Sequence, residues 1–495
     1  MAALQLLCSA TTFPILALMF LLFRCIYRLS PLHRLYHIPG PIRARLTSLW
    51  LTYHSWAGDE ASTVHSLHLT YGPIVVVGPN AVDIADGAAL SDIYVEKGGF
   101  RKPEYYLNFT VDGYRTIFSE VDSAARASRA KAVLPVFGPL RLRQGREAVY
   151  ACVQKWIDII GMEAKVGRPV DVLGLSRSFA IDAASEYLFG HSYGALDIDR
   201  RMVAKKARGE ERGRADGMID AFDAVGRYWY LPPWAYGWVD WVRITFFANA
   251  ALRKTFLVMD AYVNQAVEGA ANAEKSSLAG RFQGRLLSAG ITVGETKAQC
   301  KDALLAGVDT TGYNLAHIIF QLAKHPEIYQ ALRKEIQDSI PTDDQVQCLP
   351  YLRGVVQEGL RISTANPTRI PRVVPRCGWH FRDTFFPSGV EVSCSSYELH
   401  HNPAVFDCPQ EFRPERWLKA SREMDRDYIP FGVGFRRCIA MNLALVELYC
   451  AIHKLVEYDL LSDAQPCEDG IELKEWFNSK VVGGTIDLKW ESGHE

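Results

Sequence analysis

One cysteine in a glycine-rich loop has the surroundings of a reactive thiolate. Cys438 ends the run Phe-Gly-Val-Gly-Phe-Arg-Arg-Cys over residues 431–438, and apolar residues repeat with helical period from 442 to 448. The start of a helix carries free N–H groups and the positive end of the helix dipole, and both favour ionised sulfur. Glycine lets the backbone approach the sulfur closely, and Arg436 offers a planar cation to a carboxylate. The loop therefore predicts a thiolate at Cys438.

Other interpretations of the loop are weaker. Gly432 and Gly434 lack the third glycine of a dinucleotide fingerprint and precede a cysteine instead of a phosphate-binding turn. A nucleophilic cysteine would need a base, which the sequence does not identify. A buried structural cysteine remains open for any of the eleven cysteines. The chain has no C-x-x-C pair, which argues against a zinc ribbon and a disulfide framework.

A long predicted helix carries polar residues at its centre. Apolar residues recur at three-to-four spacing from about residue 296 to 324, and Pro326 ends the pattern. Its middle reads Ala-Gly-Val-Asp-Thr-Thr over residues 306–311. Burying Asp309 and Thr310 costs free energy unless another group uses them. In the structural alternative, Thr310 donates to a carbonyl one turn earlier and Asp309 merely faces a polar pocket.

Another predicted helix ends with an acid and a base on one face. Glu358 and Arg361 are three residues apart, and Arg416 follows in the run Phe-Arg-Pro-Glu-Arg-Trp over residues 412–417. An exposed pair of this kind would be worth less than about 1 kcal/mol. Together with Arg416, the pair instead predicts a charge-assisted network.

The composition is typical of one large domain. The 495 residues include 48% hydrophobic ones, with 55 Lys+Arg against 56 Asp+Glu and a formal net charge of -1. Such a chain can bury a large core without disulfides, and no Pro/Gly/Ser-rich linker or solenoid repeat divides it. Most of it has helical period, with a short β-branched run at residues 74–77. We expect a mainly α fold with small β-sheets, reduced cysteines and no nucleic-acid partner.

The first residues have the pattern of a membrane anchor. Residues 1–23 contain no charged side chain, and Arg24, Arg28 and Arg34 follow. The stretch is long enough to span a bilayer, and positive charge after it argues against a cleaved signal peptide. The positive-inside rule puts the chain body on the cytosolic side. We expect an anchor over residues 1–26, a proline-rich hinge over 27–41 and one domain over 42–495.

In this order, the motifs resemble those of the cytochrome P450 superfamily, and the similarity covers nearly the whole chain. The order is anchor, proline segment, A-G-x-D-T-T helix, E-x-x-R, P-E-R-W and F-x-x-G-x-R-x-C. Of these motifs only the cysteine loop is specific by itself. The resemblance implies the P450 fold preceded by a transmembrane helix, and a haem-thiolate monooxygenase with haem b as its cofactor.

The resemblance also implies roles for the residues of these motifs. Cys438 would be the axial ligand of the haem iron, and its thiolate would push electron density onto the metal. Asp309 and Thr310 would deliver protons for the cleavage of dioxygen. Phe431 would pack near the ring on the thiolate side. A structural network beneath the haem would consist of Glu358, Arg361 and Arg416.

Arginines would hold the haem propionates, and here the chain departs from the family pattern. The implied propionate ligands are Arg372, Arg436 and an arginine of the 126–129 segment, for which we take Arg129. The helix over residues 122–131 has no Trp or His where the family often has one, and Arg126 stands in that position. Ala440 replaces a usual glycine after the cysteine, which is a mild change.

The implied partners are an electron donor, a membrane and an apolar substrate. The resemblance implies an NADPH-dependent flavoprotein reductase, with cytochrome b5 as a further donor, at the cytosolic side of the endoplasmic reticulum membrane. Residues 228–241 are densely aromatic and would suit a membrane-facing lid. Residues 72–80 and 100–106 are similar to fungal secondary-metabolism members such as trichodiene-oxygenase-like enzymes, which favours a terpenoid or another secondary metabolite. The alternatives are a haem-thiolate isomerase or dehydratase without dioxygen activation, and a non-catalytic haem-binding protein.

Overall fold

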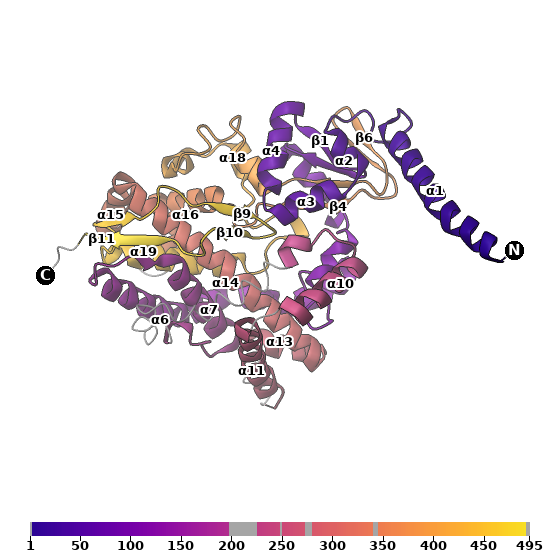
Figure 1. Ribbon diagram of the computed structural model, residues 1–495. Coiled ribbons are helices and arrows are strands. Elements are labelled where there is room, and N and C mark those ends of the chain that lie inside the picture. The colour runs from indigo at the N-terminus through magenta and orange to yellow at the C-terminus, as the bar shows by residue number, and fades with distance from the viewer. Residues whose placement is uncertain (1, 198–224, 248–249, 273–279, 340–344, 492–495) are drawn as a thin grey trace.

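Helices make up most of the molecule. The computed structural model describes residues 2–197, 225–247, 250–272, 280–339 and 345–491 (Figure 1). Its α-helices are α1 Ala2–Leu29, α2 Ile42–Leu46, α3 Leu49–Ala57, α4 Glu60–Tyr71, α5 Ser123–Val133, α6 Pro139–Ala164, α7 Val172–Phe189, α10 Pro233–Val242, α11 Ala250–Asn272, α13 Phe282–Ser288, α14 Val293–Lys324, α15 Pro326–Ser339, α16 Pro350–Ser363, α17 Ser396–His400, α18 Arg422–Asp427 and α19 Met441–Glu457.

The strands are short and form small sheets. A four-stranded sheet has the order β1-β2-β7-β4, a three-stranded sheet has the order β3-β11-β8, and the pairs β5–β6 and β9–β10 are hairpins. The predicted run at residues 74–77 is β1, and the expected mainly α fold with small sheets is confirmed. The bounds are β1 Ile74–Gly78, β2 Ala81–Ile84, β3 Val170–Asp171, β4 Arg372–Val373, β5 Trp379–Phe381, β6 Thr384–Phe386, β7 Glu391–Ser393, β8 Ala464–Pro466, β9 Leu473–Glu475, β10 Ser479–Val481 and β11 Asp487–Trp490.

Helix α14 crosses the molecule and organises its core (Figure 1). It begins where the Thr292 hydroxyl accepts the Glu295 N–H at 3.3 Å, and it ends just before Pro326, close to the predicted bounds. It packs along α7 and also contacts α11, α16 and α19. The approach to α7 is very close, because a Cβ on Gly312 would lie 2.7 Å from the Arg177 Cα. This contact places Arg177 beside the polar centre of α14.

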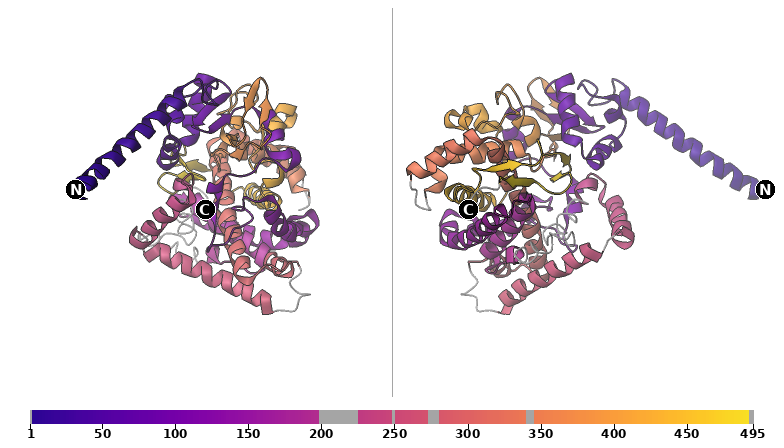
Figure 2. Two further views of the ribbon diagram at one scale, coloured as in Figure 1. Left: turned by 90° about the vertical axis from the view of Figure 1, so that its right-hand side faces the viewer. Right: turned by 60° about the vertical axis from the view of Figure 1, so that its left-hand side comes forward.

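The N-terminal segment differs from the expectation. Helix α1 projects away from the body in every view (Figures 1 and 2). Searched over the described residues, the structure contains no helix that combines the length and the apolar character of a membrane span, so the expected transmembrane helix is not supported. The proline segment is also docked: Leu35 and Ile38 are buried, and the Val76 N–H donates to the Pro39 carbonyl at 2.8 Å. The expected hinge is therefore packed on β1.

Candidate functional site

The cysteine loop is a tight turn held by its own backbone. The Cys438 N–H donates to the Phe431 carbonyl at 2.8 Å, which closes the loop just before α19 begins. Gly432 and Gly434 have φ values of 67° and 73°, a region that favours glycine. A Cβ on Gly434 would lie only 1.9 Å from the Tyr94 carbonyl oxygen. The loop therefore needs glycine at position 434 both for its backbone conformation and for its close contact with the backbone of Tyr94.

The Cys438 thiol is free and accessible. The residue is exposed and forms no disulfide. Desolvation of the thiol raises its pKa, whereas the backbone N–H of Ala440 lowers it. An N–H donor at the start of α19 stabilises sulfur that carries negative charge. The site is chemically suited to a thiolate whose charge is balanced by a bound metal.

Four cations converge beside this loop: Lys102, Arg126, Arg372 and Arg436. Burial, followed by the charges of Arg126 and Arg372, lowers the pKa of Arg436 to about 10. Burial and the charges of Arg372, Arg436 and Arg126 hold the pKa of Lys102 well below its ordinary value. In the described part of the chain, none of the four forms an ion pair with a carboxylate. Lys102 and Arg372 are buried and Arg126 and Arg436 are half-buried, and cations that repel one another in such an environment are stabilised by an anionic ligand.

Backbone contacts fix where these cations lie. Arg436 donates to the Glu120 carbonyl at 2.5 Å and to the Val121 carbonyl at 3.2 Å. Arg372 donates to the Pro371 carbonyl at 2.8 Å. Lys102 donates to the Phe118 carbonyl at 2.6 Å. Carbonyl acceptors hold the side chains without cancelling their charge, so the positive field remains available to a ligand.

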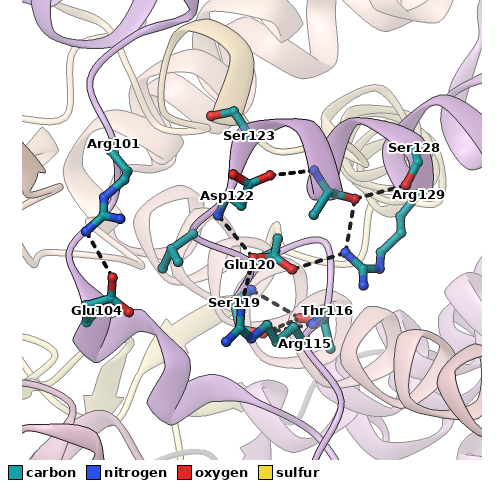
Figure 3. A network of polar contacts seen from close by, with 12 residues as sticks. Arg101, Glu104, Arg115, Thr116, Ser119, Glu120, Asp122, Ser123, Ser128 and Arg129 are labelled. Carbon is teal, nitrogen blue, oxygen red and sulfur yellow. Dashed lines mark hydrogen bonds and ion pairs between the residues drawn. The ribbon is translucent and has the colours of Figure 1, made fainter.

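Arg129 lies in a different environment (Figure 3). Its guanidinium pairs with Glu295, lies 3.2 Å from Glu120 Oε2 and donates to the Ala125 carbonyl at 3.0 Å. Two carboxylates thus neutralise it. Arg126, by contrast, has no ion pair in the described part of the chain, and its charge lowers the pKa of Arg436.

At the centre of α14, Asp309 and Thr310 have different partners. Asp309 is 3% exposed; its Oδ1 accepts Arg177 Nη2 at 2.7 Å and its Oδ2 accepts Asn478 Nδ2 at 3.2 Å. The Thr310 hydroxyl donates to the Ala306 carbonyl at 2.8 Å, one turn earlier, as the structural interpretation of the sequence expects. Ala306 itself is exposed, so this carbonyl and the hydroxyl lie where α14 is open.

Beside α14 lies a cluster of rings that we call the aromatic wall. Its centre is Trp229, which is fully buried and has its ring centroid 5.1 Å from that of Phe477 and 4.0 Å from that of Tyr230. Asn108 fastens it by donating to the Trp229 and Leu231 carbonyls at 2.9 and 2.8 Å. The aromatic wall consists of Tyr105, Tyr106, Phe109, Phe118, Trp229, Tyr230 and Phe477.

Glu358 and Arg361 are fully buried at the centre of a polar network on the cysteine side of the molecule. The carboxylate accepts both Arg361 Nη2 at 2.8 Å and Arg361 Nε at 2.9 Å. It also accepts Arg416 Nε at 3.0 Å, Trp417 Nε1 at 2.9 Å and the Arg413 N–H at 3.0 Å. The structure thus brings together the three residues that the sequence groups, and it adds two donors that the sequence does not reveal.

Comparisons with known proteins agree with this arrangement. The family model described as cytochrome P450 matches residues 39–465. The chain belongs to the cytochrome P450 family. It is 35% identical over 494 residues to the cytochrome P450 monooxygenase mfmF of Annulohypoxylon moriforme, and the aligned region covers 96% of this chain and 99% of the relative.

Other P450 relatives are more distant but also cover most of the chain. The cytochrome P450 monooxygenase tazI of Aspergillus terreus is 29% identical, with 90% of each chain covered. The pisatin demethylase of Fusarium vanettenii is 26% identical over 85% of this chain and 83% of its own length. The protein is therefore a P450 monooxygenase, and the P450 family implies a cysteine-thiolate-ligated haem iron.

The residues of this chain fit that cofactor. An accessible thiol beneath an N–H donor suits the iron, and the four cations suit the two propionates of haem. Phe431 is partly buried against the main core cluster. No sequence pattern indicates a functional role for Lys102 or Arg177. The partner of Arg177 is Asp309, more than a hundred positions away, and the cations near Lys102 lie on other elements.

Proposed function

We propose that this P450 monooxygenase uses Cys438 as the axial thiolate and oxidises an apolar secondary metabolite. The observation that best supports this proposal is the accessible Cys438 thiol in a loop closed by its own backbone. Beside the loop lie four cations that form no ion pair with a carboxylate in the described part of the chain. When bound, thiolate-ligated haem activates dioxygen with two electrons from NADPH, so that one oxygen atom enters the substrate and the other leaves as water.

The chain's own residues hold the cofactor and supply protons. Arg372, Arg436 and Arg126 bind the propionates, whereas Arg129 is already neutralised. Phe431 packs against the ring near Cys438. Thr310 and Asp309 provide the proton donors on α14, with the Thr310 hydroxyl at its open side.

The Glu358 network has a structural role in this proposal. Glu358, Arg361 and Arg416 hold α16 against the segment that precedes the cysteine loop, because Arg361 also donates to the His400 and Pro409 carbonyls at 2.8 and 2.7 Å. The Glu358 and Arg361 side chains are fully buried, and the Arg416 side chain is 7% exposed. They fix the base of the site and take no part in the reaction.

The substrate is apolar and enters from a membrane. The aromatic wall offers rings and few hydrogen-bonding groups, which suits a terpenoid or another apolar biosynthetic intermediate. The pisatin demethylase is named for the demethylation of one compound, whereas the substrate of this chain is proposed only as a chemical class.

Exposed apolar side chains support membrane association. Trp234, Trp238 and Trp241 on α10 are 79%, 69% and 56% exposed, and α1 exposes apolar side chains from Ile15 to Ile26. Both helices lie on the same side of the molecule (Figure 2). We propose that α1 and α10 associate with the surface of the endoplasmic reticulum membrane through these exposed apolar side chains. An NADPH-dependent flavoprotein reductase, with cytochrome b5 as a second donor, then supplies electrons from the cytosolic side.

The carbon-monoxide difference spectrum of the reduced protein tests the thiolate assignment. We expect a far red-shifted Soret band in the parent protein and in Cys467→Ala, an exposed cysteine that serves as the control, and loss of that band in Cys438→Ala. A parent spectrum with the band of a neutral axial ligand would overturn the proposal. Two further measurements are the consumption of NADPH and the incorporation of oxygen from labelled dioxygen into the product. Together they distinguish a monooxygenase from an isomerase, a dehydratase and a non-catalytic haem-binding protein.

A further inference from the structure

The β9–β10 hairpin reaches the centre of α14. Its turn, residues 476–478, carries Asn478, which is 4% exposed and donates from Nδ2 to Asp309 Oδ2 at 3.2 Å. Arg177 occupies the other carboxylate oxygen at 2.7 Å. Asp309 is therefore held by a cation on one oxygen and by a neutral amide on the other.

The amide of Asn478 is itself fixed. Asn366 Nδ2 donates to Asn478 Oδ1 at 2.5 Å and to the Phe477 carbonyl at 3.3 Å. The neighbouring Ser479 N–H donates to the Ala365 carbonyl at 2.9 Å. Because the Asn478 Oδ1 is occupied by a donor, its Nδ2 must face Asp309.

The preceding residue of the same turn belongs to the aromatic wall. The Phe477 ring centroid lies 4.6 Å from that of Phe109, 5.6 Å from that of Phe118 and 5.1 Å from that of Trp229. A single peptide unit therefore joins a ring that faces the apolar cluster to an amide that holds the buried acid. A displacement of the Phe477 backbone would therefore also move Asn478.

We propose that Asn478 is a positioning residue that sets the orientation of Asp309 and couples it to the aromatic wall. The proposal rests on the proposed function, in which Asp309 supplies protons. Both Asp309 oxygens are engaged by Arg177 and Asn478, and the Thr310 hydroxyl donates to the Ala306 carbonyl. Contact of a substrate with Phe477 moves the amide, and this frees one carboxylate oxygen for proton transfer.

The products of dioxygen reduction report on proton supply. Without substrate, one NADPH with one dioxygen and a proton gives NADP⁺ and hydrogen peroxide, whereas two NADPH with one dioxygen and two protons give two NADP⁺ and two waters. Delivery of protons to the outer oxygen favours water over peroxide. The peroxide recovered per NADPH therefore measures how well the acid is positioned, with dioxygen as the only oxidant.

The first experiment compares Asn478→Leu with Ser479→Ala in the haem-loaded protein supplied with reductase, NADPH and dioxygen. Leucine keeps the branching of asparagine at Cγ, is somewhat larger, and has no N–H donor. Ser479 lies beside this turn, at the start of β10, and its buried hydroxyl donates to the Thr364 carbonyl at 2.7 Å. Ser479→Ala removes this hydrogen bond and leaves Asn478 in place. We expect Asn478→Leu to change the peroxide yield per NADPH and the solvent isotope effect at least twofold, and Ser479→Ala to leave both at the parent values. Equal behaviour of the two variants would overturn the proposal.

A second readout does not depend on turnover. Urea midpoints of the parent, Asn478→Leu, Asp309→Asn and the double variant form a double-mutant cycle in the haem-loaded protein. Non-additive shifts are expected if the amide and the acid interact, and additive shifts contradict the contact. If the parent consumes no NADPH, the proposed function fails, yet the cycle still tests the pairing. If NADPH is consumed and the cycle is additive, only the positioning role fails.

Discussion

The cysteine side and the aromatic wall are held together in different ways. On the cysteine side, the loop closes through backbone hydrogen bonds, and Glu358 accepts five hydrogen bonds from four residues near it in the fold. The aromatic wall instead joins rings from segments far apart in the sequence, fastened by single polar side chains such as Asn108 and Tyr230. One region has redundant polar contacts, and the other depends mainly on packing.

This difference separates what must stay fixed from what must adapt. A haem needs its ligand at one position, and redundant hydrogen bonds in a low-dielectric interior provide that rigidity. Apolar packing has no direction, so rings can rearrange around a substrate at modest cost. We therefore expect substitutions on the cysteine side to cost stability and haem, and substitutions in the aromatic wall to cost less.

The largest effect is expected from Glu358→Gln. The amide keeps the shape but leaves Arg361 and Arg416 as buried cations without an anion, a defect that costs about 3–5 kcal/mol. We expect loss of folded, haem-bound protein at growth temperature, measured by urea unfolding and by bound haem per chain. Glu335→Gln is the matched control, because Glu335 accepts the Tyr351 and Leu352 N–H groups at 2.7 and 2.8 Å and has no ion pair in the described chain. Equal losses in both variants would contradict a special role for the network.

A smaller effect is expected from alanine in the cysteine loop, where two glycines form a matched pair. Both have positive φ, so the conformational cost of alanine is similar at each. Only Gly434 also collides, because its Cβ would lie 1.9 Å from the Tyr94 oxygen, whereas the nearest atom to a Gly432 Cβ is the Arg437 Cα at 3.9 Å. We expect Gly434→Ala to be less stable than Gly432→Ala by about 2 kcal/mol and to bind less haem. Similar urea midpoints and haem contents would show that the Tyr94 contact does not limit the loop.

The sequence predicts the cysteine side well because its geometry is local. Phe431 and Cys438 are seven positions apart, and Glu358 and Arg361 share a helical face, so spacing alone is informative. The expected spans of α14 and β1 also follow from periodicity over short windows.

Long-range partners account for what the sequence misses. Arg126 and Arg129 share helix α5, and Glu295, 166 positions away, is one of the carboxylates that neutralise Arg129. Asn478 is 169 positions from Asp309, and no spacing rule links a hairpin turn to a helix at that distance. The N-terminal expectation fails differently: an apolar run predicts a span by composition alone, and the described helices do not support one.

The smallest effect is expected in the aromatic wall, from Tyr230→Phe. The Tyr230 hydroxyl donates to Glu60 Oε1 at 2.6 Å and accepts Arg369 Nη2 at 3.1 Å. The ring remains in the variant, and Glu60 still pairs with Arg369 at 3.2 Å, so the loss at neutral pH is about 1 kcal/mol. Urea unfolding of the haem-bound protein measures it, and Tyr228→Phe is the control in the same segment.

The pH dependence sharpens this prediction. Burial raises the pKa of Glu60 from 4.5 to about 7, while the Tyr230 hydrogen bond lowers it, so Tyr230→Phe raises it further. The folded state binds the Glu60 proton more tightly than the unfolded state does. Protonated Glu60 therefore stabilises the fold below about pH 4.5, and this contribution to stability is lost as the pH rises through about 7. In Tyr230→Phe this decline extends to higher pH. A variant whose stability falls over the same pH range as the parent's would mean that the hydroxyl does not act on Glu60, and the aromatic wall would then be held by packing and by the Asn108 hydrogen bonds.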